Sequence, residues 1–335
     1  MSQQTKIEWC DSTVNFWEGC TKVSSGCANC YAEARDRRFT GGEHWGTGAP
    51  RRKSVSAVKT ALGMNWKPFV CKQCGKGRAL HELLPAKKSD SHPSGDCDCG
   101  GVVHVRRIFS LSLGDWLDDE VPIPWLVEML DTIRICSAVR WILCTKRPEL
   151  WRPRLTKALA QLTETWGEFP ERRPETELWW WLHGWLAWES CPRHIVALAS
   201  VENQDVLADR VRHLLEINVR CHGLSLEPLL GPVELTLAEL APEQTNGRPS
   251  LNWLIVGGES GPGARSCAVQ WVDKIVDAGR KTGAAVFVKQ LGTQPISVPQ
   301  HDGATGYFIE LKHRKGADVT EWSPHLRVQQ WPKGY

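Results

Sequence analysis

The stretch Val139-Arg-Trp-Ile-Leu-Cys-Thr145-Lys-Arg147 sets the pattern from which the fold can be inferred. Val139–Thr145 is a short, β-rich apolar run, Lys146 and Arg147 end it, and a helical pattern follows at Glu149–Leu162. From about residue 103 onward the chain repeats this alternation of strand and helix. Such repetition is typical of β/α units arranged around a parallel sheet.

About seven strands and four intervening helices are expected. The predicted strands are Ile7–Val14, Val103–Leu113, Val139–Thr145, His194–Val201, Gly223–Glu227, Leu251–Gly257 and Ala284–Gln290. The predicted helices are Trp125–Ile135, Glu149–Leu162, Val206–Ile217 and Trp271–Thr282. We therefore expect an α/β fold, a complete or partial TIM-like β/α barrel, with a doubly wound open sheet as the alternative.

Polar residues follow the predicted strands. They are Asp115, Lys146, Arg147, Glu202, Asn203, Glu227, Glu259 and Ser260. The carboxyl ends of the strands form the active-site face of a β/α barrel, so these side chains are expected around one opening. Helix caps or turns are the alternative for any single one of them.

Two insertions divide the predicted barrel. Residues 1–66 would hold the first strand and a cysteine-rich loop, 67–101 a small cysteine-containing insertion, 102–295 the rest of the barrel, and 296–335 a C-terminal extension. A second insertion, at about 163–192, contains the stretch Leu178–Trp188, which holds five of the eighteen tryptophans. Core packing is the preferred interpretation of this cluster, and docking of a partner protein or base stacking are the alternatives.

The composition describes a globular protein. The chain has 335 residues, 41% of them hydrophobic, and a formal net charge of +3, which does not mark a nucleic-acid binder. Thirteen cysteines without a secretory leader indicate a reducing, cytoplasmic location. The longest apolar stretch, Leu178–Trp188, is shorter than the ~20 residues that a membrane-spanning helix needs, so no membrane association is expected.

The insertion at 67–101 contains four cysteines in two close pairs, each followed by glycine. They are Cys71, Cys74, Cys97 and Cys99. Four thiolates from two turns suit tetrahedral Zn²⁺, so a structural zinc site resembling a zinc ribbon is predicted. The second pair has one intervening residue rather than two, and His81 or His92 could replace one thiolate.

Three further cysteines, Cys20, Cys27 and Cys30, lie on one loop after the first predicted strand. Four protein thiolates normally complete an iron–sulfur cluster, whereas three leave one iron free to bind a substrate or cofactor. A catalytic zinc site is the alternative, although such sites usually include histidine or carboxylate ligands. An iron–sulfur centre with an open position is therefore the favoured prediction.

This loop resembles the cluster loop of radical S-adenosylmethionine (SAM) enzymes. The strings Asn15-Phe-Trp-Glu-Gly-Cys20 and Cys27-Ala-Asn-Cys30-Tyr-Ala-Glu33 are most similar to the spore photoproduct lyase-like branch, except that the first gap is six residues rather than three. Other stretches resemble a phage- and prophage-associated, three-cysteine-motif family regarded as radical-SAM-like, whose activity is not settled. They are Thr5–Trp9, Phe109–Trp116, Trp141–Glu149, Ala199–Asn203, Leu224–Pro232, Trp253–Arg265 and Phe287–Gln290.

The resemblance implies a [4Fe–4S] cluster on Cys20, Cys27 and Cys30 whose fourth iron binds SAM. It also implies the following roles: Asn29 and Tyr31 near the adenine; Ser112, Lys146, Arg147 and Glu202 as polar contacts of the cofactor; and Glu227, Glu259, Arg265 and Lys289 facing substrate. Cys144, at the end of a predicted strand, is a candidate hydrogen-atom donor to a product radical, with a core thiol as the alternative. The glycine-rich run Gly257–Gly263 has no role assigned by the resemblance.

Three functions follow as hypotheses. The first is a radical-SAM-like enzyme that acts on a nucleic-acid base or nucleotide and draws electrons from a donor protein. The second is a non-catalytic protein that binds nucleic acid or a partner and has two structural metal sites. The third is a metal-dependent hydrolase of the barrel type, which the scarcity of histidine at the strand ends disfavours.

Overall fold

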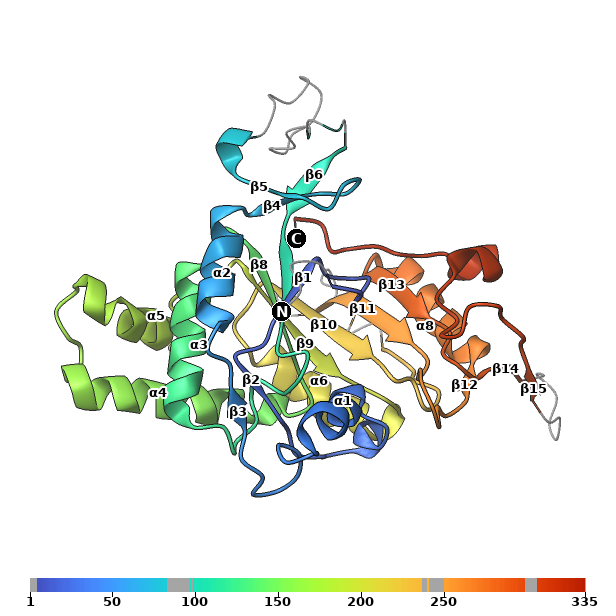
Figure 1. Ribbon diagram of the computed structural model, residues 1–335, viewed down its shortest axis with the longest axis horizontal. Coiled ribbons are helices and arrows are strands. Elements are labelled where there is room, and N and C mark those ends of the chain that lie inside the picture. Colours follow the sequence, from blue (N-terminus) through green and yellow to red (C-terminus); the bar gives the residue numbers. More distant parts are fainter. Residues whose placement is uncertain are drawn as a thin grey trace.

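A curved sheet of seven parallel strands forms the centre of the computed structural model, which describes residues 5–82, 97, 99, 101–236, 240, 250–298 and 306–334 (Figure 1). The strands are β1 (Ser12–Val14), β7 (Arg107–Ser110), β8 (Arg140–Thr145), β9 (Ile195–Ser200), β10 (Cys221–Leu226), β11 (Leu251–Gly257) and β13 (Ala285–Gln290). They lie in the sheet in the order of the chain. A doubly wound sheet reverses its order partway, so this topology excludes that alternative and confirms a partial β/α barrel.

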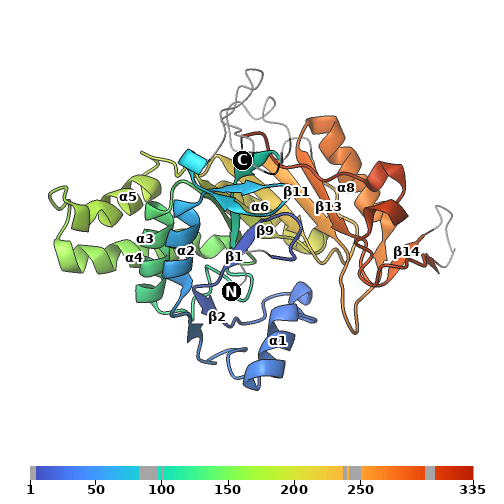
Figure 2. The same ribbon diagram turned by 45° about the horizontal axis from the view of Figure 1, so that its top comes forward.

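The helices that cover the sheet pack on its outer face. They are α2 (Ala57–Trp66), α3 (Ile123–Ile135), α4 (Trp151–Trp166), α6 (Leu207–Leu215) and α8 (Val269–Thr282). Side chains alternate along each strand, so Leu143 of β8 joins the core beneath the helices, whereas Ile142 and Cys144 join a second cluster on the inner face. Helix α1 (Tyr31–Thr40) stands apart from this outer layer, at the bottom of the view in Figure 2.

The predicted strands and helices match the observed ones closely, with two corrections. The first predicted strand, Ile7–Val14, is a strand only at Ser12–Val14. The predicted strand Val103–Leu113 is two strands, because β6 (Val103–Val105) pairs with the cysteine-containing insertion and only β7 enters the barrel. Helices α1 and α2 were not anticipated by the sequence pattern.

The gap between the edge strands β1 and β13 is filled by two segments of chain. Residues 328–330 run antiparallel to β13: the amide of Val288 donates to the carbonyl of Val328 at 2.8 Å, and that of Gln330 donates to Val286 at 2.8 Å. Beyond them, the indole of Trp331 donates to the carbonyl of Trp9 at 3.0 Å. These contacts close one end of the inner face with aromatic side chains.

The cysteine-containing insertion forms its own small sheet. Strand β4 (Phe69–Cys71) lies between β5 (Gly77–Arg78) and β6, antiparallel to both. In Figure 1 it projects above the barrel. There are two other small sheets. One pairs β2 (Trp17–Glu18) with β3 (Arg52–Lys53), and in the other β14 (Pro295–Ser297) lies between β12 (Cys267–Ala268) and β15 (Tyr307–Phe308).

The tryptophan-rich insertion is a helical hairpin of α4 and α5 (Glu177–Leu186). Trp185 is fully buried and donates to the carbonyl of Asn218 at 2.8 Å, and Trp179 donates to the hydroxyl of Thr163 at 2.8 Å. Trp188, by contrast, is 49% exposed. The burial supports the packing interpretation, while docking of a partner stays a prediction. Among the described residues, no helix combines the length and apolar character needed to cross a membrane.

Candidate functional site

A cavity of about 450 Å³ opens at the carboxyl ends of the strands, within the usual range for small-molecule sites. Twelve predicted site residues line it: Cys20, Cys27, Asn29, Cys30, Tyr31, Ser112, Cys144, Lys146, Arg147, Glu227, Glu259 and Lys289. They come from segments as far apart in the chain as the N-terminal loop and β13. The fold thus brings the cysteine loop and the polar strand ends to one place.

Cys20 is held at the wall of this cavity by Arg147. One guanidinium nitrogen of Arg147 lies 3.5 Å from the Cys20 sulfur and 3.2 Å from Asp115, and the other donates to the carbonyl of Thr21 at 2.6 Å. Burial raises the pKa of Cys20 to about 12, and Asp115 acts in the same direction, whereas Arg147 opposes them. The guanidinium thus supplies positive charge where a thiolate ligand would need it.

Cys30 precedes the first residue of α1, so its sulfur lies near the backbone amides at that end of the helix. Burial raises the pKa of Cys30, and the amides of Glu33 and Ala32 lower it without offsetting the burial. Cys27 lies between these cysteines in sequence, and its sulfur is 3.9 Å from the hydroxyl of Ser24. Helix N-termini favour negative charge, so the position of Cys30 suits a thiolate.

The spacing of the three sulfurs distinguishes this group from the insertion. Among the described residues, Cys20, Cys27 and Cys30 do not form a group whose ligand atoms all lie within 4.8 Å of one another. Thiolates on one tetrahedral zinc ion lie about 3.8 Å apart, given Zn–S bonds of ~2.3 Å. Thiolates on separate irons of a cubane cluster lie farther apart, so a cluster would not require the three sulfurs to lie this close to one another.

A set of hydrogen bonds, here called the latch, joins the cysteine loop to the loop after β11. Glu259 accepts from the side-chain amide of Asn29 at 3.0 Å and from the guanidinium of Arg265 at 2.6 and 2.9 Å. Arg265 also donates to the carbonyl of Ser25 at 2.8 Å. Four strands separate β1 from β11 in the sheet, so the latch spans the mouth of the partial barrel.

The latch changes the interpretation of two predicted site residues. Asn29 and Glu259 line the cavity, but their polar atoms bind each other and Arg265. The positions of both side chains therefore fix the loop that carries Cys27 and Cys30. The glycine-rich run after β11, which had no role in the sequence analysis, carries the Glu259 end of this latch.

Glu202 also supports the cysteine loop. Its side chain is fully buried, accepts from Arg210 at 2.7 Å and accepts from the backbone amide of Gly26 at 3.3 Å. Burial raises the pKa of Glu202, but hydrogen bonds from Ser24 and Arg210 and the charge of Lys146 outweigh it, so the net shift is downward. A Cβ atom on Gly26 would lie 3.1 Å from the carboxyl carbon, so only glycine allows this approach without displacement.

The remaining side chains form the inner wall. Lys289 lies 2.9 Å from Glu227, the sulfur of Cys144 lies 3.4 Å from the hydroxyl of Ser200, and burial raises the pKa of Cys144. Lys146 has no carboxylate within 4.0 Å among the described residues, and its charge acts to lower the pKa values of both Cys30 and Cys144. Lys146 is thus a cation available to an anionic group in the cavity.

Three cavity residues were not assigned roles from the sequence. Asp115 accepts from the hydroxyl of Thr145 at 2.7 Å and from the amide of Lys146 at 2.9 Å, which fixes the end of β8. Ser200 and Ser225 lie at the ends of β9 and β10 and line the cavity. The period-two alternation of strand residues could have identified both serines, because it places them on the same face as Cys144.

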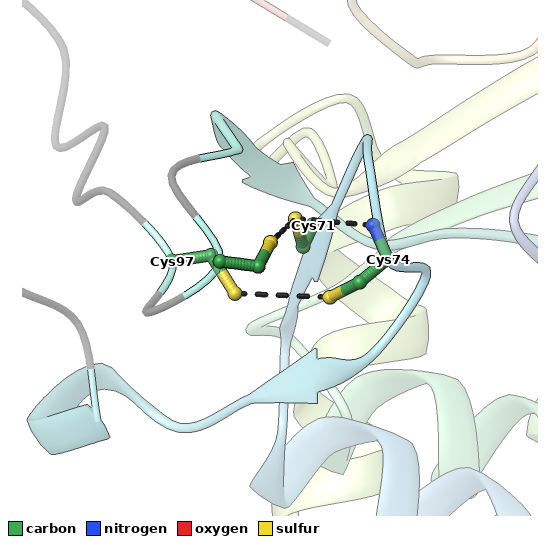
Figure 3. Close-up of side chains that lie close together, drawn as sticks. Cys71, Cys74 and Cys97 are labelled. Atoms are coloured by element: carbon green, nitrogen blue, oxygen red, sulfur yellow. Dashed lines mark hydrogen bonds between the residues drawn. The ribbon is translucent and has the colours of Figure 1, made fainter.

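The insertion provides a second, separate group of ligands (Figure 3). The ligand atoms of Cys71, Cys74, Cys97 and Cys99 all lie within 4.8 Å of one another. The Cys71 and Cys99 sulfurs are 3.5 Å apart, and those of Cys74 and Cys97 are 3.8 Å apart, close to the tetrahedral spacing. The four cysteines can therefore hold a metal ion.

The surroundings of this group favour thiolates at Cys71 and Cys97. Burial raises the pKa of Cys71, but hydrogen bonding to the backbone amides of Cys74 and Gln73 outweighs this effect, and the net result is a pKa lowered to about 6. Arg78 donates to the Cys97 sulfur at 3.2 Å. Of the two alternative ligands, His81 is exposed and His92 lies outside the described residues.

Comparison with known proteins identifies the family. No curated protein and no solved structure matches the chain. A family model described as "Protein of unknown function (DUF5131)" matches residues 4–318, which is nearly the whole chain. With its partial β/α barrel and its four-cysteine metal-binding group, this chain belongs to the DUF5131 family.

Proposed function

We propose that this protein is an iron–sulfur enzyme of the radical SAM type that acts on a nucleic-acid base or nucleotide, and that Zn²⁺ holds its four-cysteine insertion. One observation carries the proposal: the three thiols of the N-terminal loop and the polar strand ends line the same cavity. A purely structural metal site would not need to face a cavity at the carboxyl ends of a β/α barrel.

The residues present fit a cluster with an open position. Cys20, Cys27 and Cys30 would be its ligands, and their sulfurs are more widely spaced than one ion requires. A cluster held there would supply the one-electron reduction that cleaves the sulfonium of SAM, the chemistry that yields methionine and a 5′-deoxyadenosyl radical able to abstract a hydrogen atom from substrate. Arg147 would stabilise a thiolate at Cys20, and Lys146, which lines the cavity, would bind the carboxylate of SAM.

The latch and Glu202 hold the cysteine loop in position. They hold the loop between Ser24 and Asn29 from two sides, so the thiols keep their place at the cavity wall. The assignment of the substrate rests on the resemblance of the loop and on the aromatic side chains of Trp9 and Phe109 in the cavity. A one-electron donor protein is part of the proposal.

The test is purification and reconstitution without oxygen. We expect about three to four irons and as many sulfides per chain, together with one zinc, as the ligand sets dictate. With dithionite as the reductant, the protein should convert SAM to methionine and 5′-deoxyadenosine. A colourless protein that contains zinc alone would contradict the proposal and favour a non-catalytic binder.

Two variants give the matched comparison. Cys27→Ala should remove the iron and its chromophore but retain the zinc. Cys191→Ala replaces a half-buried cysteine outside both groups and should retain both metals. Hydrolytic activity in air with zinc bound to Cys20, Cys27 and Cys30 would instead support the hydrolase hypothesis.

A further inference from the structure

Glu227 and Lys289 form an ion pair on the inner wall of the cavity. The ammonium of Lys289 lies 2.9 Å from one carboxylate oxygen of Glu227, and the side chains are 23% and 13% exposed, respectively. Lys289 lies in β13 and Glu227 follows β10, so two different strand ends converge to form the pair. Neither side chain belongs to the latch or touches the cysteine loop through any hydrogen bond among the described residues.

Both partners have hydrogen-bonding capacity left. The second carboxylate oxygen of Glu227 has only the hydroxyl of Ser225, at 3.4 Å, a long contact. The ammonium has three protons, and among the described residues Glu227 is its hydrogen-bonding partner. Burial lowers the pKa of Lys289, but Glu227 raises it by more, so the ammonium stays protonated. The pair therefore presents an acceptor and a donor side by side to the cavity.

The ion pair discriminates between ligands by the charge of the group that approaches it. An anionic group that approached Lys289 would meet the carboxylate of Glu227, and a cationic group would meet the ammonium. A neutral group with a donor and an acceptor on neighbouring atoms satisfies both at once, and a cyclic amide offers this combination in its ring N–H and adjacent carbonyl. Trp9 and Phe109, whose ring centroids are 4.8 Å apart and whose planes are tilted by 50°, give the cavity an aromatic wall.

We propose that Glu227 and Lys289 bind the lactam edge of a flat heterocycle, the carboxylate accepting from the ring N–H and the ammonium donating to the neighbouring carbonyl oxygen. This inference deepens the proposed function, on which it rests for naming the heterocycle as substrate. Among nucleic-acid bases, uracil, thymine and guanine carry such an edge, and uridine and guanosine serve as the probes. Methylation of the ring nitrogen removes the donor and places a methyl group against Glu227.

The test measures nucleoside binding to the full, metal-loaded chain by ligand-observed NMR titration, without SAM. Uridine or guanosine should bind, and 3-methyluridine and 1-methylguanosine should bind roughly 10- to 100-fold more weakly, the loss expected for a hydrogen bond to a charged group. Absence of binding by both parent nucleosides, or equal binding of parent and methylated forms, would overturn the inference.

A double variant provides the second arm. Glu227→Leu combined with Lys289→Met replaces a buried ion pair by apolar side chains, a change that proteins often tolerate. It should weaken nucleoside binding at least roughly tenfold with an unchanged urea midpoint. The control is Lys53→Met, which removes a surface ion pair with Glu128 at 2.6 Å and should leave binding intact. If the folded double variant binds as well as the wild type, the inference is wrong.

The outcomes separate the two proposals. Cleavage of SAM by a protein that does not discriminate the methylated nucleosides would leave the proposed function standing and remove the inference. Discrimination of those nucleosides by a protein without iron would leave the lactam site standing and remove the radical SAM assignment.

Discussion

Replacement of Arg265 by methionine should release the latch across the mouth of the barrel. The change removes two guanidinium hydrogen bonds to Glu259, at 2.6 and 2.9 Å, and one to the carbonyl of Ser25 at 2.8 Å. Glu259, only 6% exposed, would keep Asn29 and the backbone amide of residue 265. Among the described residues, the carboxylate of Glu259 would thus lose its one cationic partner but keep two of its hydrogen-bond donors.

The expected loss in the free energy of unfolding follows from how far the Arg265–Glu259 ion pair is buried. Removing one partner of a fully buried ion pair costs about 3–5 kcal/mol. The side chain of Arg265 is 34% exposed, so water can replace part of what is lost, and we expect about 2 kcal/mol. Urea unfolding followed by tryptophan fluorescence, under anaerobic conditions with metals bound, measures the loss. The control Arg212→Met breaks an exposed pair with Asp209 and should have no measurable effect.

The stability lost in the Arg265→Met variant should depend on pH. Burial raises the pKa of Glu259, but Arg265 and Asn29 lower it by more, to below the ordinary 4.5. A carboxyl group with a depressed pKa contributes stability above its unfolded-state pKa and loses it as the pH falls through the folded-state value. The difference between wild type and Arg265→Met should be complete at pH 7 and shrink below pH 4.5. A difference that is absent at pH 7, or constant down to pH 3, refutes the role given to the latch.

Three further predictions concern other parts of the chain. The pKa of Asp11 is lowered to about 2, because hydrogen bonding to His104 and the charge of Arg107 outweigh the effect of burial. Asp11→Asn should therefore lower the free energy of unfolding in urea by about 2 kcal/mol at pH 7 and have no effect below pH 2. Equal losses at both pH values would contradict this. Gly101→Ala puts a Cβ atom 2.7 Å from the Cys71 sulfur and should lower the zinc content measured by elemental analysis, whereas Gly63→Ala, with open space around it, should not; full zinc in both variants would count against the site. Trp185→Leu should cost about 3 kcal/mol in the same unfolding assay, because its indole is fully buried, and a loss no larger than that of Trp188→Leu would contradict the packing of the hairpin.

The barrel and the four-cysteine group were predictable because their signals are local. Val139–Thr145 and Leu251–Gly257 are apolar runs whose composition alone indicates strands, and both match β8 and β11 closely. Cys71 and Cys74 are joined by one tight turn, so their spacing indicates a metal site before any tertiary contact is known. The division between β6 and β7 was missed because residues 103–113 are uniformly β-rich, and only pairing shows where one sheet ends.

The partners of the polar strand ends could not be predicted. Glu202 was expected to contact a cofactor, and it is bound instead by Arg210 and the amide of Gly26. Asn29 and Glu259 are 230 residues apart in sequence, and nothing in either local pattern relates them. A carboxylate after a strand has the same sequence signature whether it faces a ligand or an internal cation, and the fold alone decides between them.

The open seam between β1 and β13 makes the interior adjustable. In a closed barrel the radius is fixed by strand number and stagger, and altering it requires a new register around the whole ring. Here the seam is filled by Trp9 and Trp331 rather than by a ladder of backbone hydrogen bonds between the edge strands. The width of the chamber can therefore change through exchange of a few aromatic side chains at the seam, without altering any strand pairing.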